Sequence, residues 1–556
     1  MPAAQFLANF PVDPADPILS DLQGNILKGH GRQFTFNLFL SFKAGKRKEV
    51  GNWIASFSSV FVTTARKQQD ETQLFHDERI PGSVFASFFI TAEGYKYLGV
   101  ASAKKPTDPK FGVGMKASNA ALKDPNPATW SAGLNGADGV IHAMVLVADA
   151  DIHQARSLTR AIKLSLATKA TVVAVERGVV LRNAEGEGIE HNNYVDGISQ
   201  PVFFANEVPA HTDKWDPRAT PSLMLVADPG GQDGNSMGSY FVFRKLEQNV
   251  RGFKTQEKET AKIVFNLPAN EASWTPAQAT EAELIGAWAV GRFEDGTPVM
   301  LHGTAQQPAM GHLENNFNFA DAGSDSKCPF HAHIRKSGPR TDLAGADFNK
   351  TKRLVRRGIP YEDKPRIRDA EGNLSDKPED LPTGGVGLLF MCYVANIANQ
   401  FEFVQQAWVN APGFSQPDTG KDPLIGQPTD LSNAHPTQYH WPTDYGAAGR
   451  KDARFGDFIN MRGGEYFFAP SLSMLKSLRT DPPALAKVQK TPALSTVPKL
   501  GVPVGILHDT SLFHFDPNLV SGVSVLDPLL QLFVPDKDDV GAGVVNTVHT
   551  EHTVNV

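Results

Sequence analysis

The segment from Cys328 to Lys336, Cys-Pro-Phe-His-Ala-His-Ile-Arg-Lys, has the side chains of a metal-ligand site. It offers one thiol and two imidazoles, which are soft and borderline ligands for transition metals. Arginines follow at high density, at positions 335, 340, 353, 356 and 357. Guanidinium groups suit the bidentate recognition of carboxylates or phosphates. The segment therefore predicts an iron site beside an anionic ligand, although a solvated basic surface would have the same composition.

A second group of residues with chemical potential lies between Glu190 and Pro201, in the run EHNNYVDGISQP. An Asp-Gly pair is typical of a turn, because glycine adopts a positive φ without steric cost. If the pair also has a chemical role, Asp196 is a short and rigidly placed carboxylate. Such a group can move a proton as general acid and base.

The elements expected in the first half of the chain follow the order β, α, β, β, α, β. Between Asp151 and Ala167, apolar residues recur every three or four positions, as on one face of a helix. The full order is the ferredoxin-like one, in which helices cover one face of an antiparallel sheet. The expected strands are Gln33–Phe42, Ser83–Thr91, Val140–Val147 and Thr171–Val179, and the expected helices are Arg47–Thr64 and Asp151–Ala167.

The second half repeats this logic less regularly, with strands expected at Ser239–Leu246 and Val386–Tyr393 and helices at Glu281–Trp288 and Ile397–Val409. We therefore predict an α+β protein of two ferredoxin-like modules, with antiparallel sheets and peripheral helices. The predicted N-terminal module spans residues 1–205 and ends in the Asp196-Gly197 motif. The predicted C-terminal module spans 206–480, and 481–556 is an extension of unknown role. The polar stretch 324–380 is expected to be a functional insertion.

Composition limits the functional classes. The net charge of −6 argues against a sequence-independent nucleic-acid binder, which usually carries a basic excess. The N-terminus lacks the apolar core of a secretory signal, and the longest apolar runs are too short to cross a bilayer. We expect no membrane partner and a cytoplasmic location, with unconventional export and a homo-oligomer left open. Two cysteines cannot form a disulfide framework or a four-cysteine zinc site.

Several separated motifs resemble, in the same order, those of the dye-decolourising peroxidase family, which are haem enzymes built from two ferredoxin-like modules. The resemblance starts at Asp21-Leu22-Gln23-Gly24-Asn25 and ends near Arg462–Ser471, so it excludes roughly the last 75 residues. Its motifs are the Asp-Gly-Ile-Ser-Gln-Pro run at 196–201, the Cys-Pro to His-Ile-Arg-Lys run at 328–336, the Arg-Arg-Gly-Ile-Pro-Tyr run at 356–361 and the Gly-Leu-Leu-Phe run at 387–390.

The resemblance implies a role for each motif. By this resemblance, His333 has the position of the proximal haem ligand, which puts haem b in the C-terminal module. Asp196 is similar to the distal acid and base and Arg356 to the distal cation, which would stabilise cleavage of the O–O bond. Leu388 and Phe390 are similar to apolar residues that line the distal pocket.

Two further expectations concern single residues. A metal-binding histidine usually needs an acceptor for its second ring nitrogen, and Glu402, on the helix expected at 399–409, is a candidate for that position beside the cofactor.

Asn193 occupies a position that is glycine in the family signature. Asparagine tolerates positive φ better than most residues, so the departure puts activity only mildly in question.

The expected function is a haem peroxidase that uses hydrogen peroxide to oxidise dyes, phenols and other aromatic reductants. One alternative is a haem-thiolate protein in which Cys328 binds the iron. Another is a haem carrier or iron-releasing protein that uses the same pocket without significant turnover. The physiological reductant is not written in the sequence.

Overall fold

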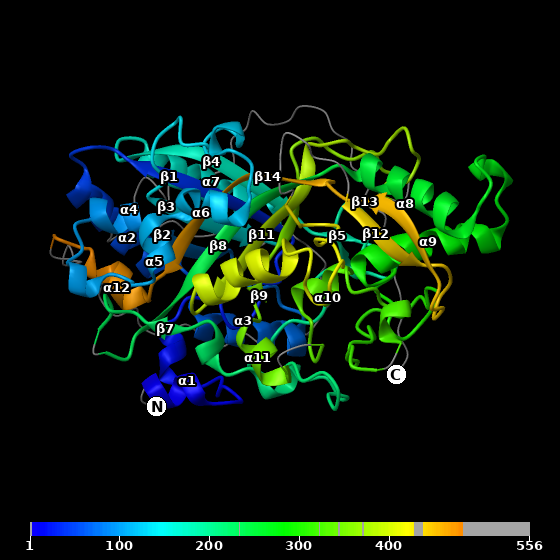
Figure 1. The fold of residues 1–556 in the computed structure, drawn as a ribbon. Helices are drawn as coiled ribbons and strands as arrows, with labels where there is room; N and C mark the ends of the chain where they lie inside the picture. The colour runs from blue at the N-terminus through cyan, green and yellow to red at the C-terminus, as the bar shows by residue number, and fades with distance from the viewer. Residues whose placement is uncertain are drawn as a thin grey trace, which may run out of the picture.

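A computed structural model of the chain describes residues 3–232, 234–321, 323–342, 345–369, 372–427 and 437–481. Beyond residue 481, the predicted C-terminal extension lies outside the described residues. In Figure 1 the helices α2 (Arg47–Val60) and α4 (Ala92–Tyr97) lie at one end of the molecule. The helices α8 (Val250–Phe265) and α9 (Pro276–Val290) lie at the other end.

The first half forms an antiparallel sheet in the order β2-β3-β1-β4. Its crossover helix α7 begins after Asp151, whose carboxylate accepts a hydrogen bond from His153 N and so caps the helix. Leu158 and Ile162, one turn apart, are buried against the sheet. The elements of this half are β1 (Phe34–Phe42), α2, β2 (Phe85–Ile90), β3 (Ala143–Asp149), α7 (Ile152–Leu166) and β4 (Ala170–Val179).

The second half repeats this strand order as β10-β11-β8-β14, again antiparallel. Its crossovers are α8 and the π-helical segments Ala398–Glu402 and Val404–Val409. Strand β10 contains Pro360, which is compatible with its place at the edge of this path, where one side needs no ladder hydrogen bond. The strands are β8 (Met237–Gln248), β10 (Ile359–Glu362), β11 (Val386–Val394) and β14 (Ile459–Ala469).

The two modules share one continuous sheet. Strand β14 of the second half pairs with β2 of the first, with Phe468 opposite Ile90. At the other end of the path, Gly178 of β4 lies against the side chain of Ile359 of β10, so the two edge strands face each other. The sheet therefore curls back on itself and encloses a core.

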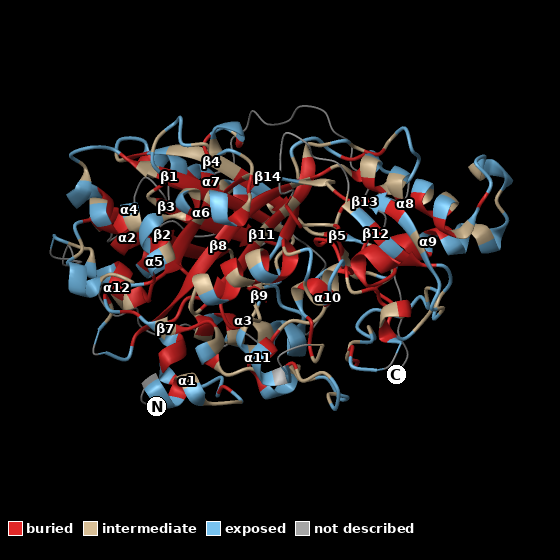
Figure 2. Cartoon of the chain, in the orientation of Figure 1, coloured by how far each residue is buried: buried red, intermediate tan, exposed pale blue. Residues whose placement is uncertain are grey.

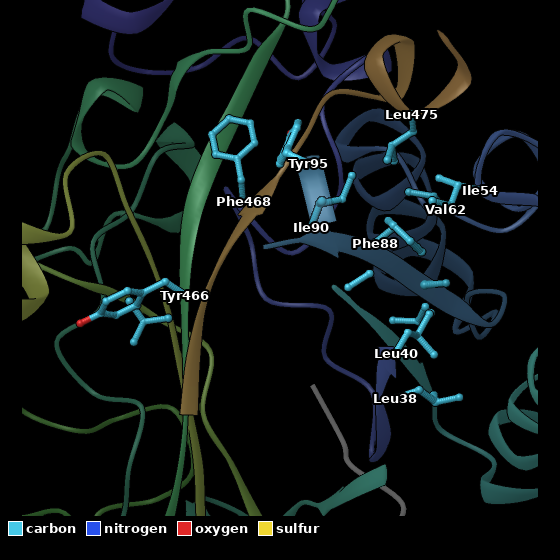
Figure 3. Packing of buried hydrophobic residues seen from close by; sticks show 14 of the residues in the cluster. Leu38, Leu40, Ile54, Val62, Phe88, Ile90, Tyr95, Tyr466, Phe468 and Leu475 are labelled. Carbon is cyan, nitrogen blue, oxygen red and sulfur yellow. The ribbon is translucent and has the colours of Figure 1, made fainter. Parts of the chain in front are cut away.

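Alternation along the strands divides that core into an inner and an outer cluster. Phe39, Phe241 and Phe243 pack inside the curled sheet. Leu38 and Leu40 of β1 face the other side, where they meet helix residues such as Ile54; Figure 3 shows this outer cluster, which also contains Phe88 and Tyr466. Figure 2 shows buried residues along the strands and exposed residues on the outer faces of the helices.

The remaining elements are short or lie outside the main sheet. A third buried cluster joins α8 and α9 to the hairpin of β12 and β13. The elements are α1 (Ala3–Ala8), α3 (Ala65–Glu78), α5 (Pro109–Val113), α6 (Met115–Leu122), α10 (His333–Ser337), α11 (Gly345–Thr351), α12 (Leu472–Ser477), β5 (Leu181–Arg182), β6 (Gly188–Ile189), β7 (Val226–Ala227), β9 (Val355–Arg356), β12 (Thr437–Pro442) and β13 (Arg450–Phe455).

The predicted α+β fold with two ferredoxin-like modules is confirmed, with one continuous sheet in place of two separate ones. The stretch 324–380 is not a plain insertion, because it supplies β10, the second strand of the second module. The module boundary at 205/206 stays a prediction. Among the described residues, no helix has the length and apolar character needed to cross a bilayer.

Candidate active site

A cavity lies on the helix-facing side of β8 and β11, next to the second π-helical segment. Side chains alternate along β11, so Leu388 and Phe390 both face this cavity. The alternate residues, Leu389 and Met391, face the inner core. Leu246 of β8 also lines it. The cavity therefore has apolar walls, and the two residues expected to line a distal pocket do line it.

His333 is the first residue of α10 and lines the same cavity. Its Nδ1 lies 2.8 Å from Asp422 Oδ2, and the Asp422 side chain has no solvent exposure. With Nδ1 donating to this carboxylate, Nε2 is the ring nitrogen that can bind a metal. Burial alone would lower the pKa of His333, but the charge of Asp422 and its hydrogen bond raise it above its ordinary value. The imidazole is therefore fixed in orientation and strongly polarised.

Asp422 is itself fixed by the backbone. Its Oδ1 accepts hydrogen bonds from the N–H groups of Leu424 and Ile425, both at 2.9 Å. Burial would raise the pKa of this carboxyl, but His333 and the backbone donors hold the pKa below its ordinary value. Asp422 is thus an ionised acceptor of the kind that raises the basicity of a metal-binding imidazole.

Glu402 does not have this role, and the expectation that it accepts from His333 is wrong. Its carboxylate accepts from Tyr466 Oη at 2.9 Å and pairs with Lys110 Nζ at 2.8 Å. Glu402 ends the first π-helical segment, where hydrogen bonds run to the fifth residue and each turn is wider than in an α-helix. That turn directs the Glu402 side chain toward β14 and α5, and Val404 and Gln405 line the cavity instead.

Asp196 and Arg356 form an ion pair at the cavity. Arg356 Nη1 donates to Asp196 Oδ1 at 3.0 Å, and Nη2 donates to the carbonyl of Ile198 at 2.7 Å. Arg356 is placed by β9, where it pairs with Cys392 of β11. The Asp196 side chain lies among protein atoms but lines the cavity, and 38% of its surface is accessible there. The two groups expected to act together are therefore in contact.

The charge state of Asp196 is set by this contact. Burial opposes ionisation, but the Arg356 guanidinium and the Gly197 N–H, which donates to Oδ1 at 2.6 Å, hold the pKa of Asp196 below its ordinary value. Asp196 and His333 also lie close enough for their charges to interact. At neutral pH the cavity thus presents a carboxylate that can accept a proton.

The turn before Asp196 has the conformation that its sequence requires. Asn193 has φ 75° and Gly197 has φ 87°. Asparagine is one of the few residues that reaches this region at low cost, and its amide donates to Asp376 Oδ1 at 2.7 Å. The replacement of the family glycine by Asn193 therefore leaves the turn intact.

Cys328 does not reach the cavity. It is fully buried in the cluster under α9 and does not line the site. Burial raises the pKa of its thiol to about 12, whereas a metal-binding cysteine must be a thiolate. Among the residues at 328–336 that could bind iron, His333 is the one that lines the cavity, because His331 lies between Tyr439 and Trp441.

Comparisons with known proteins identify the family of the chain. The family model described as Dyp-type peroxidase, C-terminal, matches residues 294–418. The multifunctional dye peroxidase DyP2 of Amycolatopsis sp. (strain ATCC 39116 / 75iv2) is 37% identical over 480 residues, 84% of this chain and 96% of that protein. An Anabaena sp. DyP-type peroxidase superposes with a TM-score of 0.75 at 39% identity, over 85% of this chain and 99% of that one. A dye-decolorizing peroxidase solved with 2,6-dimethoxyphenol superposes with a TM-score of 0.66 at 28% identity, over 83% and 98%.

The chain belongs to the DyP-type peroxidase family. It is therefore an oxidoreductase of the peroxidase class, and haem is its cofactor. Enzymatic turnover is the shared activity of the named relatives, which argues against a carrier that lacks it.

The residues present fit haem. The cavity has apolar walls for a macrocycle, and His333 offers an imidazole nitrogen for iron. Five arginines line it, of which Arg244 pairs with Asp124 and Arg356 with Asp196. The other three, Arg292, Arg340 and Arg353, form no ion pair within the part of the chain described. Arg353 also has a buried Nη1 without a hydrogen-bond partner. These guanidinium groups would suit the carboxylates of haem. Arg335 and Arg357 have other roles, since Arg335 pairs with Asp342 and Arg357 donates to carbonyls at Asn25 and Ile26.

Proposed function

We propose that the chain is a haem b peroxidase that reduces hydrogen peroxide and oxidises phenols and dyes, with His333 as the iron ligand. The observation that carries this proposal is the arrangement around one apolar cavity, which places the His333–Asp422 pair and the Asp196–Arg356 pair together. When bound, haem would supply an iron that binds peroxide and exchanges electrons with it.

Asp196 would move the proton that O–O cleavage requires. Its carboxylate takes the proton from one oxygen of peroxide and returns it to the other, so that the departing oxygen leaves as water. The low pKa of Asp196 keeps the base form available in acid solution. Asp196 lines the cavity, and the Arg356 and Gly197 donors hold its side chain in place.

Arg356 would stabilise the negative charge that develops on the departing oxygen. A guanidinium keeps its proton throughout, and here it is oriented by Asp196 and by the carbonyl of Ile198 before any reaction occurs. The apolar side chains of Leu388 and Phe390 limit water in the cavity and so strengthen that interaction.

An aromatic reductant would complete turnover. The relative solved with 2,6-dimethoxyphenol binds a phenol, and other relatives are named for the decolorization of dyes. We therefore assign phenols and dyes as the reducing substrates of this chain.

The test is an Asp196→Asn substitution in the haem-loaded protein, with hydrogen peroxide and 2,6-dimethoxyphenol as substrates. Loss of the acid-base group should lower kcat/KM for peroxide by about 10²–10⁴-fold, while the Soret band stays. Asp376→Asn is the matched control, because Asp376 contacts the same turn through Asn193 but does not line the cavity. Full activity in Asp196→Asn would refute the assignment.

A further inference from the structure

Lys336 is a buried cation on the helix that carries His333. Its side chain is completely buried, three residues after His333 in α10. The ammonium donates three hydrogen bonds to backbone carbonyls, at 2.8 Å to Ala411, 2.7 Å to Phe414 and 2.6 Å to Gly420. A lysine ammonium has three protons, so each of them has an acceptor.

All three carbonyls belong to the loop that leads to Asp422. The loop leaves the second π-helical segment at Val409 and returns there, because Asp422 N donates to the carbonyl of Val409 at 2.8 Å. Gly420 N likewise donates to the carbonyl of Pro412 at 2.9 Å. Gly420, whose carbonyl gives the shortest of the Lys336 contacts, lies two residues before Asp422. Helix α10 therefore touches this loop twice, once through His333 and once through Lys336.

Packing alone does not account for a lysine at this position. Lys336 forms no ion pair with any carboxylate in the described ranges, and its ammonium lies away from solvent. A buried charge without a paired carboxylate is costly, and here burial lowers the pKa of Lys336 to about 8. An apolar side chain of similar length would fill the same space at lower cost, so the three contacts to the loop are the feature that requires an ammonium.

We propose that Lys336 is a positioning residue that holds the Asp422 loop against α10 and thereby keeps Asp422 within hydrogen-bond distance of His333. The strength of the Asp422–His333 bond determines how much imidazolate character the ring has, and this character sets the properties of the bound iron. Lys336 thus acts on the iron only through Asp422. The inference rests on the proposed assignment of His333 as the iron ligand.

Lys336 could act by anchoring the loop or by its positive charge, and the two actions predict opposite changes in the iron reduction potential when Lys336 is replaced. If Lys336 mainly anchors the loop, its loss weakens the Asp422–His333 bond, the ring becomes a weaker donor, and the iron reduction potential rises. If Lys336 mainly contributes a positive charge, its loss leaves Asp422 more basic and the potential falls. The geometry points to anchoring, because three short hydrogen bonds are present and Lys336 does not contact Asp422 directly.

The experiment measures the Fe–His stretching frequency and the iron reduction potential of holoenzyme carrying Lys336→Met or Lys336→Arg. Both variants should lower the frequency and raise the potential, to values between wild type and Asp422→Asn. Arginine keeps the charge but its planar fork cannot aim three N–H groups at these convergent carbonyls, so it isolates the anchoring. If the Met variant yields no holoenzyme, the Arg variant decides alone.

Arg335→Met is the matched control, since Arg335 is also a buried cation of α10 but pairs with Asp342 and does not contact the loop. It should reduce stability and leave the Fe–His frequency unchanged. In an Asp422→Asn background, Lys336→Met should add no further shift, because the coupling would already be lost. A frequency that is unchanged in both Lys336 variants, or a potential that falls, overturns the inference. If His333→Ala retains the Fe–His band, the ligand assignment itself fails instead.

Discussion

Replacing Asp422 with asparagine should weaken peroxide activation by about 10–100-fold, the range typical of groups that hydrogen-bond to a metal ligand. The structure explains a loss of this size. The amide oxygen of the variant can still accept from the N–H groups of Leu424 and Ile425, so the side chain keeps two of its three hydrogen bonds. The contact that is lost is the charge-assisted bond to His333 at 2.8 Å. Such a bond contributes about 1.5–3 kcal/mol, and each 1.36 kcal/mol is a factor of about ten in rate.

The rate constant to measure is that of the reaction of haem-loaded protein with hydrogen peroxide, followed by stopped-flow absorbance in the Soret region. Glu402→Gln is the matched control, because Glu402 is another buried carboxylate whose partners are Tyr466 and Lys110. That variant should react with peroxide at the wild-type rate even if its stability is lower. Unfolding in denaturant, measured on both variants, separates a loss of stability from a loss of rate.

Two results would refute this reasoning. An Asp422→Asn variant that reacts at the wild-type rate would show that the His333 contact does not influence the iron. A Glu402→Gln variant that is slowed as much as Asp422→Asn would show that the buried carboxylates act through general stability and not through the imidazole.

Three further outcomes follow from the site. Arg356→Leu removes the cation that holds the pKa of Asp196 low, so the pKa of Asp196 should rise. The base form is then lost at a higher pH, and the acid limb of the pH profile of kcat/KM should shift to higher pH. An acid limb at the wild-type pH would contradict this. Cys328→Ser should leave the Soret spectrum unchanged, whereas His333→Ala should abolish it, and the reverse pattern would restore the thiolate alternative. Asn193→Gly should change the free energy of unfolding by less than about 0.5 kcal/mol, as measured by urea denaturation. Asn193→Val should lower that free energy by about 1–2 kcal/mol, because β-branched residues are strained at φ 75°.

The sequence predicted the elements of the first module well because its patterns are regular. The strand expected at 33–42 is β1, and the apolar residues that recur between 151 and 167 mark α7, whose observed bounds are Ile152–Leu166. The second module was less visible. Helix α8 was not expected at all, and β10 lies in a polar stretch and contains Pro360, so neither its composition nor its periodicity marks a strand. Its place became apparent only from pairing with β11, a long-range contact.

Site residues could be predicted where a sequence motif identifies them. They could not be predicted where the contact depends on the course of the backbone through a loop. His333, Asp196 and Arg356 were expected from ordered motifs, and the structure brings them to one cavity. Asp422 was missed because it lies in a loop without periodicity, 89 residues after its partner. Glu402 was the carboxylate expected to accept from His333, but its segment is π-helical and its side chain contacts Tyr466 and Lys110 instead.

The shared sheet explains why the Asp196–Arg356 pair joins residues from both halves of the chain. The turn with Asp196 ends the predicted N-terminal module, and Arg356 reaches it from β9, which pairs with β11 of the second module. Because β14 joins β2 and the sheet curls until β4 meets β10, the end of the first module is carried to the face of the second. A change that loosens this closure, for example at Gly178, where an added Cβ would lie 2.4 Å from Ile359, should therefore move Asp196 relative to Arg356 without touching either residue. Activity would then fall more than haem binding does, since His333 and Asp422 both lie within the second module.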